Sequence, residues 1–151
     1  MEVLIRDMYI NDVSTIIKYD LIMLGETLGE EIIKDHINNS DLMKYFVMEN
    51  KDNKEIIGQM SLWIDIDKAQ INNFYILKKY QKQNLGKKFL KYIINYLYLN
   101  NVKEITLEVK KSNIPAIKLY ELFDFKVVSV RKNYYSDGED AYLMYLRIGS
   151  E

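Results

Sequence analysis

The chain of 151 residues contains no cysteine and one histidine, and its 21 basic and 22 acidic residues leave a formal net charge of −1. This length is typical of one domain, which we expect to cover residues 1–151. The absence of cysteine excludes disulfides, zinc–thiolate sites and a cysteine nucleophile. Because His36 is the single histidine, we also expect no metal site. Because basic and acidic residues are nearly balanced, we expect no binding to nucleic acid. The sequence shows no apolar run of about 20 residues and no leader sequence, so we expect a cytoplasmic protein that does not bind a membrane.

Hydrophobic periodicity predicts four strands and two helices in the first half of the chain. The first helix begins after Asp12, which can cap it, and ends at Gly25, a residue favoured at helix C-termini. A second helix is expected over residues 26–37, where Ser40 and the two asparagines before it interrupt the pattern. The strands are expected at residues 3–6, at 45–48, at 55–64 and in a segment ending near residue 77.

The second half of the chain predicts two more helices and three more strands. The longer helix covers residues 85–100, and its apolar side is expected to comprise Leu85, Phe89, Tyr92, Ile93, Tyr96 and Leu97. The shorter helix runs from Pro115 to about Phe123. The strands are expected at residues 105–109, 127–130 and 142–148, with a turn at Ser136-Asp137-Gly138 between the last two. The fold class is therefore α/β (α+β), a mixed central sheet of about seven strands flanked by about four helices.

A polar turn between an apolar strand and the long helix is the first candidate site. Such a strand–turn–helix arrangement points backbone N–H groups at a phosphate, and neighbouring lysines add positive charge. The turn reads Gln81-x-x-Asn84-x-Gly86, which matches neither common nucleotide-binding glycine motif. Asn84 tolerates a left-handed backbone, and Gly86 lets a ligand approach closely. The alternative is an ordinary connection with a solvated basic patch.

Glu108 is the second candidate, because it interrupts an apolar, β-branched strand. Side chains alternate between the faces of a strand, so Glu108 shares a face with Thr106. A carboxylate that is partly removed from water can act as a general base near neutral pH. The alternative is a solvent-facing glutamate on a half-exposed strand.

The third candidate is the short helix that follows Ser112-Asn113. Asn113 can cap this helix, and Tyr120 lies one turn beyond the small residue Ala116. A tyrosine hydroxyl can donate a proton to a leaving thiolate. The alternative is a tyrosine packed in the core, since the chain contains 13 tyrosines.

Together these features resemble the GNAT superfamily of N-acetyltransferases and, within it, the ribosomal-protein-alanine N-acetyltransferases. The signature of the superfamily is Gln/Arg-x-x-Gly-x-Gly/Ala at a strand-to-helix turn, and here Asn84 replaces its first glycine. The resemblance extends over residues 71–146 and includes the twelve-residue spacing from Glu108 to Tyr120. The matching motifs are Leu107-Glu108-Val109, Ser112-Asn113, Ala116-x-x-Leu119-Tyr120, Asp124-Phe125, Arg131-x-x-Tyr134-Tyr135 and Glu139-Asp140-Ala141.

The resemblance implies a role for each matching residue. Glu108 would take a proton from the acceptor ammonium through a water molecule, and Tyr120 would return one to the thiolate of coenzyme A. Acetyl-CoA would be bound by the backbone of Phe74, Tyr75 and Ile76, by the turn Gln81, Lys82, Gln83, Asn84, Leu85, Gly86 and Lys87, and by Asn113. Tyr134 and Tyr135 would line the site of the acceptor.

The resemblance also implies direct attack of an amine on the thioester in a ternary complex. A protein N-terminal α-amine is the expected acceptor; a small amine such as a polyamine, amino acid or aminoglycoside is the alternative. A non-catalytic module that only binds acyl-CoA is a third possibility. Residues 24–31 depart from the pattern, because they lack the proline and aromatic residues that help form the acceptor site in such enzymes.

Overall fold

The computed structural model describes residues 1–149, which form a seven-stranded sheet in the order β1-β2-β3-β4-β5-β7-β6. Neighbouring strands are antiparallel except for β4 and β5, which pair in parallel. The strands are β1 Val3–Asp7, β2 Met43–Asn50, β3 Ile56–Asp65, β4 Lys68–Ile76, β5 Glu104–Lys110, β6 Lys126–Arg131 and β7 Ala141–Arg147.

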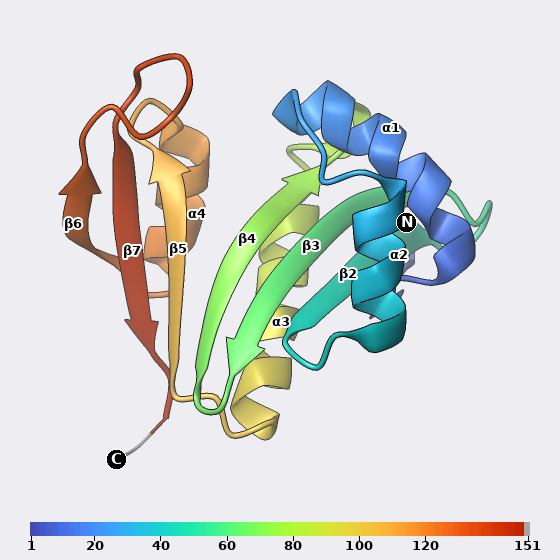
Figure 1. Cartoon of the computed structure of the whole chain (residues 1–151), viewed down its shortest axis with the longest axis horizontal. Coiled ribbons are helices and arrows are strands. Elements are labelled where there is room, and N and C mark those ends of the chain that lie inside the picture. The colour runs from blue at the N-terminus through green and yellow to red at the C-terminus, as the bar shows by residue number, and fades with distance from the viewer. Residues whose placement is uncertain (150–151) are drawn as a thin grey trace.

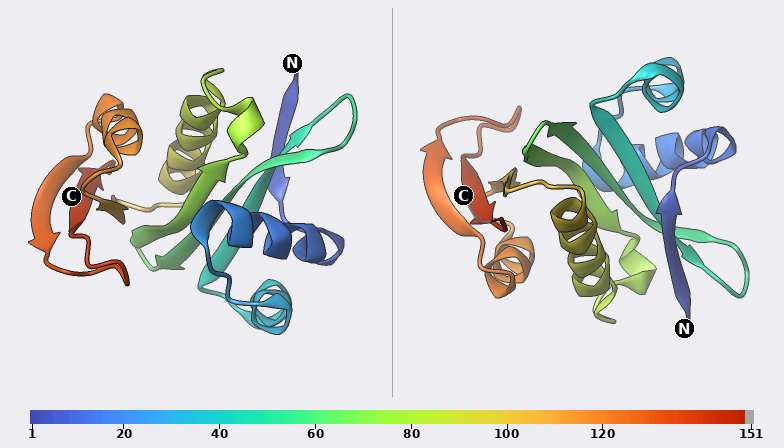
Figure 2. Two further views of the ribbon diagram at one scale, coloured as in Figure 1. Left: turned by 90° about the horizontal axis from the view of Figure 1, so that it is seen from above. Right: turned by 90° about the horizontal axis from the view of Figure 1, so that it is seen from below.

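Two helices cover each face of this sheet. Helices α1 (Val13–Leu24) and α2 (Glu30–Asn39) lie on one face, while α3 (Leu85–Leu99) and α4 (Ile114–Leu122) lie on the other (Figures 1 and 2). Short 3₁₀ turns at Ile10–Asp12 and Lys78–Tyr80 precede α1 and α3. The predicted mixed sheet of seven strands with four helices is thus confirmed. Within residues 1–149, no helix is long and apolar enough to cross a membrane.

The larger core lies between the sheet and helices α3 and α4. Helix α3 contributes Phe89, Leu90, Ile93 and Leu97, all fully buried. The prediction that Tyr92 belongs to this apolar side is wrong, because Tyr92 is exposed. The helical period turns Leu90 toward the sheet and Tyr92 away from it.

A smaller core lies under α1 and α2. Val13 and Ile16 of α1 are fully buried there with Ile33 of α2. The next position on the same face of α1 is Asp20, which is also buried, whereas Leu21 is half exposed. A carboxylate therefore occupies a position of α1 that the spacing would assign to an apolar side chain.

The second helix is shorter than its sequence predicts. It begins at Glu30 instead of residue 26, because Gly29 at its N-terminus has φ +94°, a backbone conformation that a helix cannot contain. Residues 25–29 therefore form a non-helical segment, which we call the α1–α2 linker. The turn predicted between β6 and β7 is present, and Gly138 in it has φ +84°.

The parallel strands β4 and β5 pair along only part of their length. Pairing extends from Lys68 with Glu104 to Ile71 with Leu107, and the strands then diverge (Figure 1). Asn72 follows as an extra residue in β4 relative to β3, which is a β-bulge. Beyond the bulge, the β5-facing edge of β4 has no partner strand among residues 1–149. Glu108 lies on β5, across this divergence from β4.

Candidate active site

The turn before α3 has an unusual backbone. Lys82 and Asn84 both have left-handed conformations, with φ values of +63° and +62°. Asn84 is the N-cap residue of α3, and within residues 1–149 no side-chain capping hydrogen bond is formed at this end of the helix. Left-handed residues interspersed in a turn orient successive N–H groups toward one side, and the helix dipole adds partial positive charge there. The turn therefore presents free donors, together with the exposed Lys82 and Lys87, to an anion.

Gly86 is not required by packing within the protein. A Cβ atom at this position would lie 3.6 Å from Leu119 and 3.8 Å from Phe74, which are ordinary contact distances. The absence of a side chain instead keeps the start of α3 open to a ligand. This observation, together with the free N–H groups, fits the pyrophosphate of acetyl-CoA.

Side-chain contacts hold this turn against the sheet. The Gln81 side chain donates a hydrogen bond from Nε2 to the carbonyl oxygen of Ile76 at 2.9 Å. Tyr80 donates its hydroxyl hydrogen to Glu55 Oε2 at 2.5 Å, and Lys79 Nζ lies 3.0 Å from Glu55 Oε1. The side chain of Gln81 thus braces the turn, in which Gln81, Lys82 and Gln83 are all exposed residues.

The end of β4 offers backbone groups to the divergence between β4 and β5. The Phe74 ring packs against Phe89 on the α3 side of the sheet, with ring centroids 5.7 Å apart, and Ile76 is buried on that side too. Tyr75 points to the opposite face, where its hydroxyl bonds to Asp20. With all three side chains engaged, a ligand could reach this segment only through its main chain on the β5-facing edge, since the other edge pairs with β3 and the Ile76 carbonyl already accepts from Gln81.

Glu108 lies at the divergence on the same face of the sheet as α1 and α2. Leu107 and Val109 on either side of it face the large core, so alternation turns Glu108 away from that core. Its side chain is only 15% exposed, and Oε2 lies 3.6 Å from Nε of Arg131. Within residues 1–149, Oε2 accepts no hydrogen bond. The description of Glu108 as an ordinary solvent-facing residue is therefore wrong.

The loop between β6 and β7 brings two tyrosines to Glu108. The approach of the Tyr134 hydroxyl to the Glu108 carboxylate raises the pKa of Tyr134. Burial, followed by the charge of Glu108, raises the pKa of Tyr135 to about 12. The two rings meet edge to face with centroids 5.1 Å apart. Both residues therefore border the carboxylate from one side.

Ion pairs and hydrogen bonds fasten this loop to the end of β5. Lys110 Nζ lies 2.7 Å from Asp137 Oδ2, and the N–H of Ser112 donates to Glu139 Oε1 at 2.7 Å. The next residue, Asn113, caps α4, and its Oδ1 accepts from the N–H of Ala116 at 3.3 Å. The predicted cap is thus confirmed, and the side-chain amide nitrogen of Asn113 is left for a ligand.

Tyr120 approaches the divergence from the face opposite to Glu108. Its ring packs against Phe125, with centroids 5.6 Å apart, and lies 6.5 Å from Phe74. Burial raises the pKa of the Tyr120 phenol. Within the described residues its hydroxyl forms no hydrogen bond, so Tyr120 is a core residue with an unpaired hydroxyl.

Sequence reasoning assigned no role to three side chains that shape this site. Arg131 was part of a recognised motif, but pairing of its guanidinium with Glu108 depends on the register of β6 and β7. Glu55 lies far from the turn in the chain. Only Asp20 had a local signal, because it occupies the apolar face of α1.

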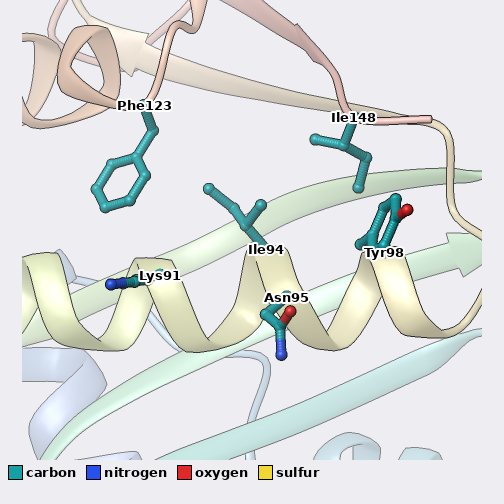
Figure 3. Close-up of a pocket in the computed structure, with 6 residues that line it drawn as sticks. All are labelled: Lys91, Ile94, Asn95, Tyr98, Phe123 and Ile148. Carbon is teal, nitrogen blue, oxygen red and sulfur yellow. The ribbon is translucent and has the colours of Figure 1, made fainter. Parts of the chain in front are cut away.

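A separate cleft lies away from the candidate site. It has a volume of about 460 Å³ and lies between α3 and the segments that follow α4 and β7 (Figure 3). Its lining residues, none of which belongs to the candidate site, are Lys91, Ile94, Asn95, Tyr98, Phe123 and Ile148.

Comparison with known proteins places these features in a family. A sequence model described as the acetyltransferase (GNAT) family matches residues 16–125. An N-alpha-acetyltransferase of Sulfurisphaera tokodaii is 31% identical over 93% of this chain and 90% of its own. A ribosomal protein bS18-alanine N-acetyltransferase of Escherichia coli is 41% identical over 55% of this chain and 58% of its own.

The solved structures agree with this placement. The crystal structure of the ribosomal-protein-S18-alanine N-acetyltransferase from Escherichia coli superposes with a TM-score of 0.87, at 27% identity, over 99% of this chain and 96% of that one. The chain belongs to the GNAT family of N-acetyltransferases.

Proposed function

We propose that this enzyme acetylates the N-terminal α-amine of a protein. The observation that carries the proposal is the position of Glu108, which is largely buried at the divergence of β4 and β5 and bordered by Arg131 and the two tyrosines of the β6–β7 loop. A carboxylate with a free oxygen in such surroundings suits a group that must take a proton from an ammonium.

Acetyl-CoA would bind on the side of α3 and α4. Its pyrophosphate would contact the backbone of the turn Gln81–Lys87, including Gln83 and Leu85, together with the ammonium groups of Lys82 and Lys87. The main chain of residues 74–76 would bond to the pantetheine arm, and Asn113 would contact the coenzyme from the start of α4. The thioester, when bound, supplies an activated acetyl group.

Glu108 and Tyr120 would act on the two protons of the reaction. Glu108 would accept one from the acceptor ammonium, either directly or through water, and the amine would attack the thioester carbonyl carbon. Tyr120 would donate its hydroxyl proton to the departing thiolate as the carbon–sulfur bond breaks, and the second proton, lost by the nitrogen as the amide forms, would restore the Tyr120 hydroxyl. Direct attack agrees with a chain that has no cysteine for an acyl-enzyme intermediate.

The acceptor class is supported by amine chemistry and by the relatives. A free α-amine has a reference pKa of about 7.7–8.0, against about 10.4 for lysine, so a modest carboxylate base suits it better. Tyr134 and Tyr135 would line the path of the acceptor peptide beside Glu108.

An acetyl-transfer assay that measures released thiol tests the proposal. A peptide beginning with a free alanine should be acetylated faster than spermidine, and the same peptide with a blocked N-terminus but an internal lysine is the matched control. Faster reaction with spermidine would assign the enzyme to small amines instead. Acetyl-CoA should also raise the melting temperature, because it binds the native state.

A further inference from the structure

Asp20 is the most deeply buried charged side chain outside the candidate site, with 3% of its surface exposed. Its Oδ1 accepts a hydrogen bond from the Tyr75 hydroxyl at 2.6 Å, and its Oδ2 accepts one from the Thr27 hydroxyl at 3.0 Å. Both carboxylate oxygens are therefore bonded. Burying a carboxylate is unfavourable unless such bonds are formed, so this position carries a cost that an apolar side chain would avoid.

The two bonds join three separate parts of the chain. Asp20 belongs to α1, Thr27 belongs to the α1–α2 linker, and Tyr75 belongs to the end of β4 that borders the divergence from β5. Thr27 continues the connection, because its hydroxyl oxygen accepts a hydrogen bond from the N–H of Gly29 at 3.3 Å. The linker has no helical hydrogen bonds of its own at this point, so these contacts define its path.

The linker lies where it can affect the acceptor. It passes beside the end of β4 (Figure 1), on the face of the sheet toward which Glu108 also points. The turn expected to bind the coenzyme, by contrast, begins α3 on the opposite face. A shift of the linker would therefore change the acceptor side of the divergence and leave the coenzyme side in place.

We infer that Asp20 is a positioning residue that fixes the α1–α2 linker against β4 and thereby sets the affinity for the acceptor. The inference rests on the proposed function, in which the acceptor binds on the face of α1 and α2. Burial raises the pKa of Asp20, while the bonds from Tyr75 and Thr27 oppose this change.

Conservative variants remove the two bonds one at a time. Tyr75→Phe deletes the hydroxyl but keeps the main chain that would face the coenzyme, and Thr27→Val keeps the shape of the threonine side chain. Asp20→Asn removes the charge. The matched control is Tyr145→Phe, which deletes a tyrosine hydroxyl bonded to Glu104 Oε2 at 2.9 Å, away from the linker.

Three measurements are made on each variant. Steady-state kinetics with the alanine peptide should show a KM for the peptide raised about tenfold in Tyr75→Phe and Thr27→Val, since a hydrogen bond to a charged group contributes on this order. The dissociation constant for acetyl-CoA should stay within about twofold of the wild-type value. Hydrogen–deuterium exchange should accelerate in residues 21–32 and stay unchanged in residues 81–88, and Tyr145→Phe should alter neither.

The outcomes separate this inference from the proposed function. If the wild-type enzyme acetylates no peptide, the proposed function fails. The role of Asp20 in holding the α1–α2 linker can still be tested in that case, because unchanged hydrogen exchange in residues 21–32 of the variants would refute it. If the wild-type enzyme does acetylate the peptide, an unchanged peptide KM in Tyr75→Phe and Thr27→Val overturns the inference. An equal loss of acetyl-CoA affinity would also overturn it, because that result would indicate a general loss of structure.

Discussion

Because Asn84 has a left-handed backbone conformation, we expect its substitution by alanine to weaken acetyl-CoA binding by an amount that can be estimated. Asn84 has φ +62° and ψ +17°, and its side chain does not cap the helix, so we expect its contribution to be the backbone conformation alone. Alanine disfavours this conformation by about 1 kcal/mol relative to asparagine or glycine. Asn84→Ala should therefore lower the free energy of unfolding by about 1 kcal/mol, whereas Asn84→Gly should be nearly neutral.

The same strain should appear in the affinity for acetyl-CoA. If alanine relaxes the turn of the free enzyme, binding must restore the left-handed backbone, and about 1 kcal/mol corresponds to a dissociation constant raised about fivefold. Glycine should retain the affinity, because it adopts this conformation without cost. Isothermal titration calorimetry with acetyl-CoA measures the change directly and needs no acceptor.

Asn101, just after the other end of α3, provides the matched control. It follows the C-terminus of α3, has φ +65°, and lies at the opposite end of the helix from the turn. Asn101→Ala should lose similar stability without weakening acetyl-CoA binding. Equal dissociation constants for wild type and Asn84→Ala would refute the reasoning, as would an equal loss of affinity in both alanine variants.

Other predictions concern the catalytic pair and the β6–β7 loop. Glu108→Gln should lower kcat about a hundredfold and leave the calorimetric affinity for acetyl-CoA unchanged, and an unchanged kcat would make Glu108 structural. Tyr120→Phe should lower kcat but not the free energy of unfolding, because the hydroxyl has no hydrogen bond within residues 1–149; marked destabilisation in a denaturant titration would contradict this. Lys110 lowers the pKa of Asp137, so their ion pair should hold the loop above the ordinary pKa of aspartate and release it as the pH falls through the lowered value. Hydrogen exchange in residues 132–140 should show this acid release in the wild type and not in Asp137→Asn, whose loop should exchange faster at neutral pH.

The order of the elements could be predicted because each has a local signal. Alternation identified the strands, and the cap at Asn113 and the spacing of Phe89, Ile93 and Leu97 identified the last two helices. The start of α2 could not be predicted, because the acidic residues around Gly29 favour a helix and only its backbone conformation excludes one. The burial of Leu90 could not be predicted either, because it depends on how α3 is rotated about its axis against the sheet.

The site was predictable where one strand or turn forms it. Alternation placed Glu108 on the same strand face as Thr106, which is the face away from the large core, and the tolerance of asparagine for a left-handed backbone anticipated the conformation of Asn84. The contacts of Arg131 with Glu108 and of Glu55 with Tyr80 join residues far apart in the chain. Such contacts depend on strand register, which a single sequence does not encode locally.

The divergence of β4 and β5 explains why the proposed chemistry needs contributions from both faces of the sheet. Glu108 faces the side of α1 and α2, while Tyr120 belongs to the core on the side of α3 and α4. Continuous pairing of the strands would close the sheet between these groups, but pairing ends at Ile71 and Leu107. In the proposed reaction, the acceptor and the coenzyme therefore enter from opposite faces and meet where the strands separate, so that one proton leaves toward Glu108 and another arrives from Tyr120. On the same proposal, a contact such as Asp20 with Tyr75 would affect the acceptor alone, because it lies on the face of the sheet opposite to the one expected to bind the coenzyme.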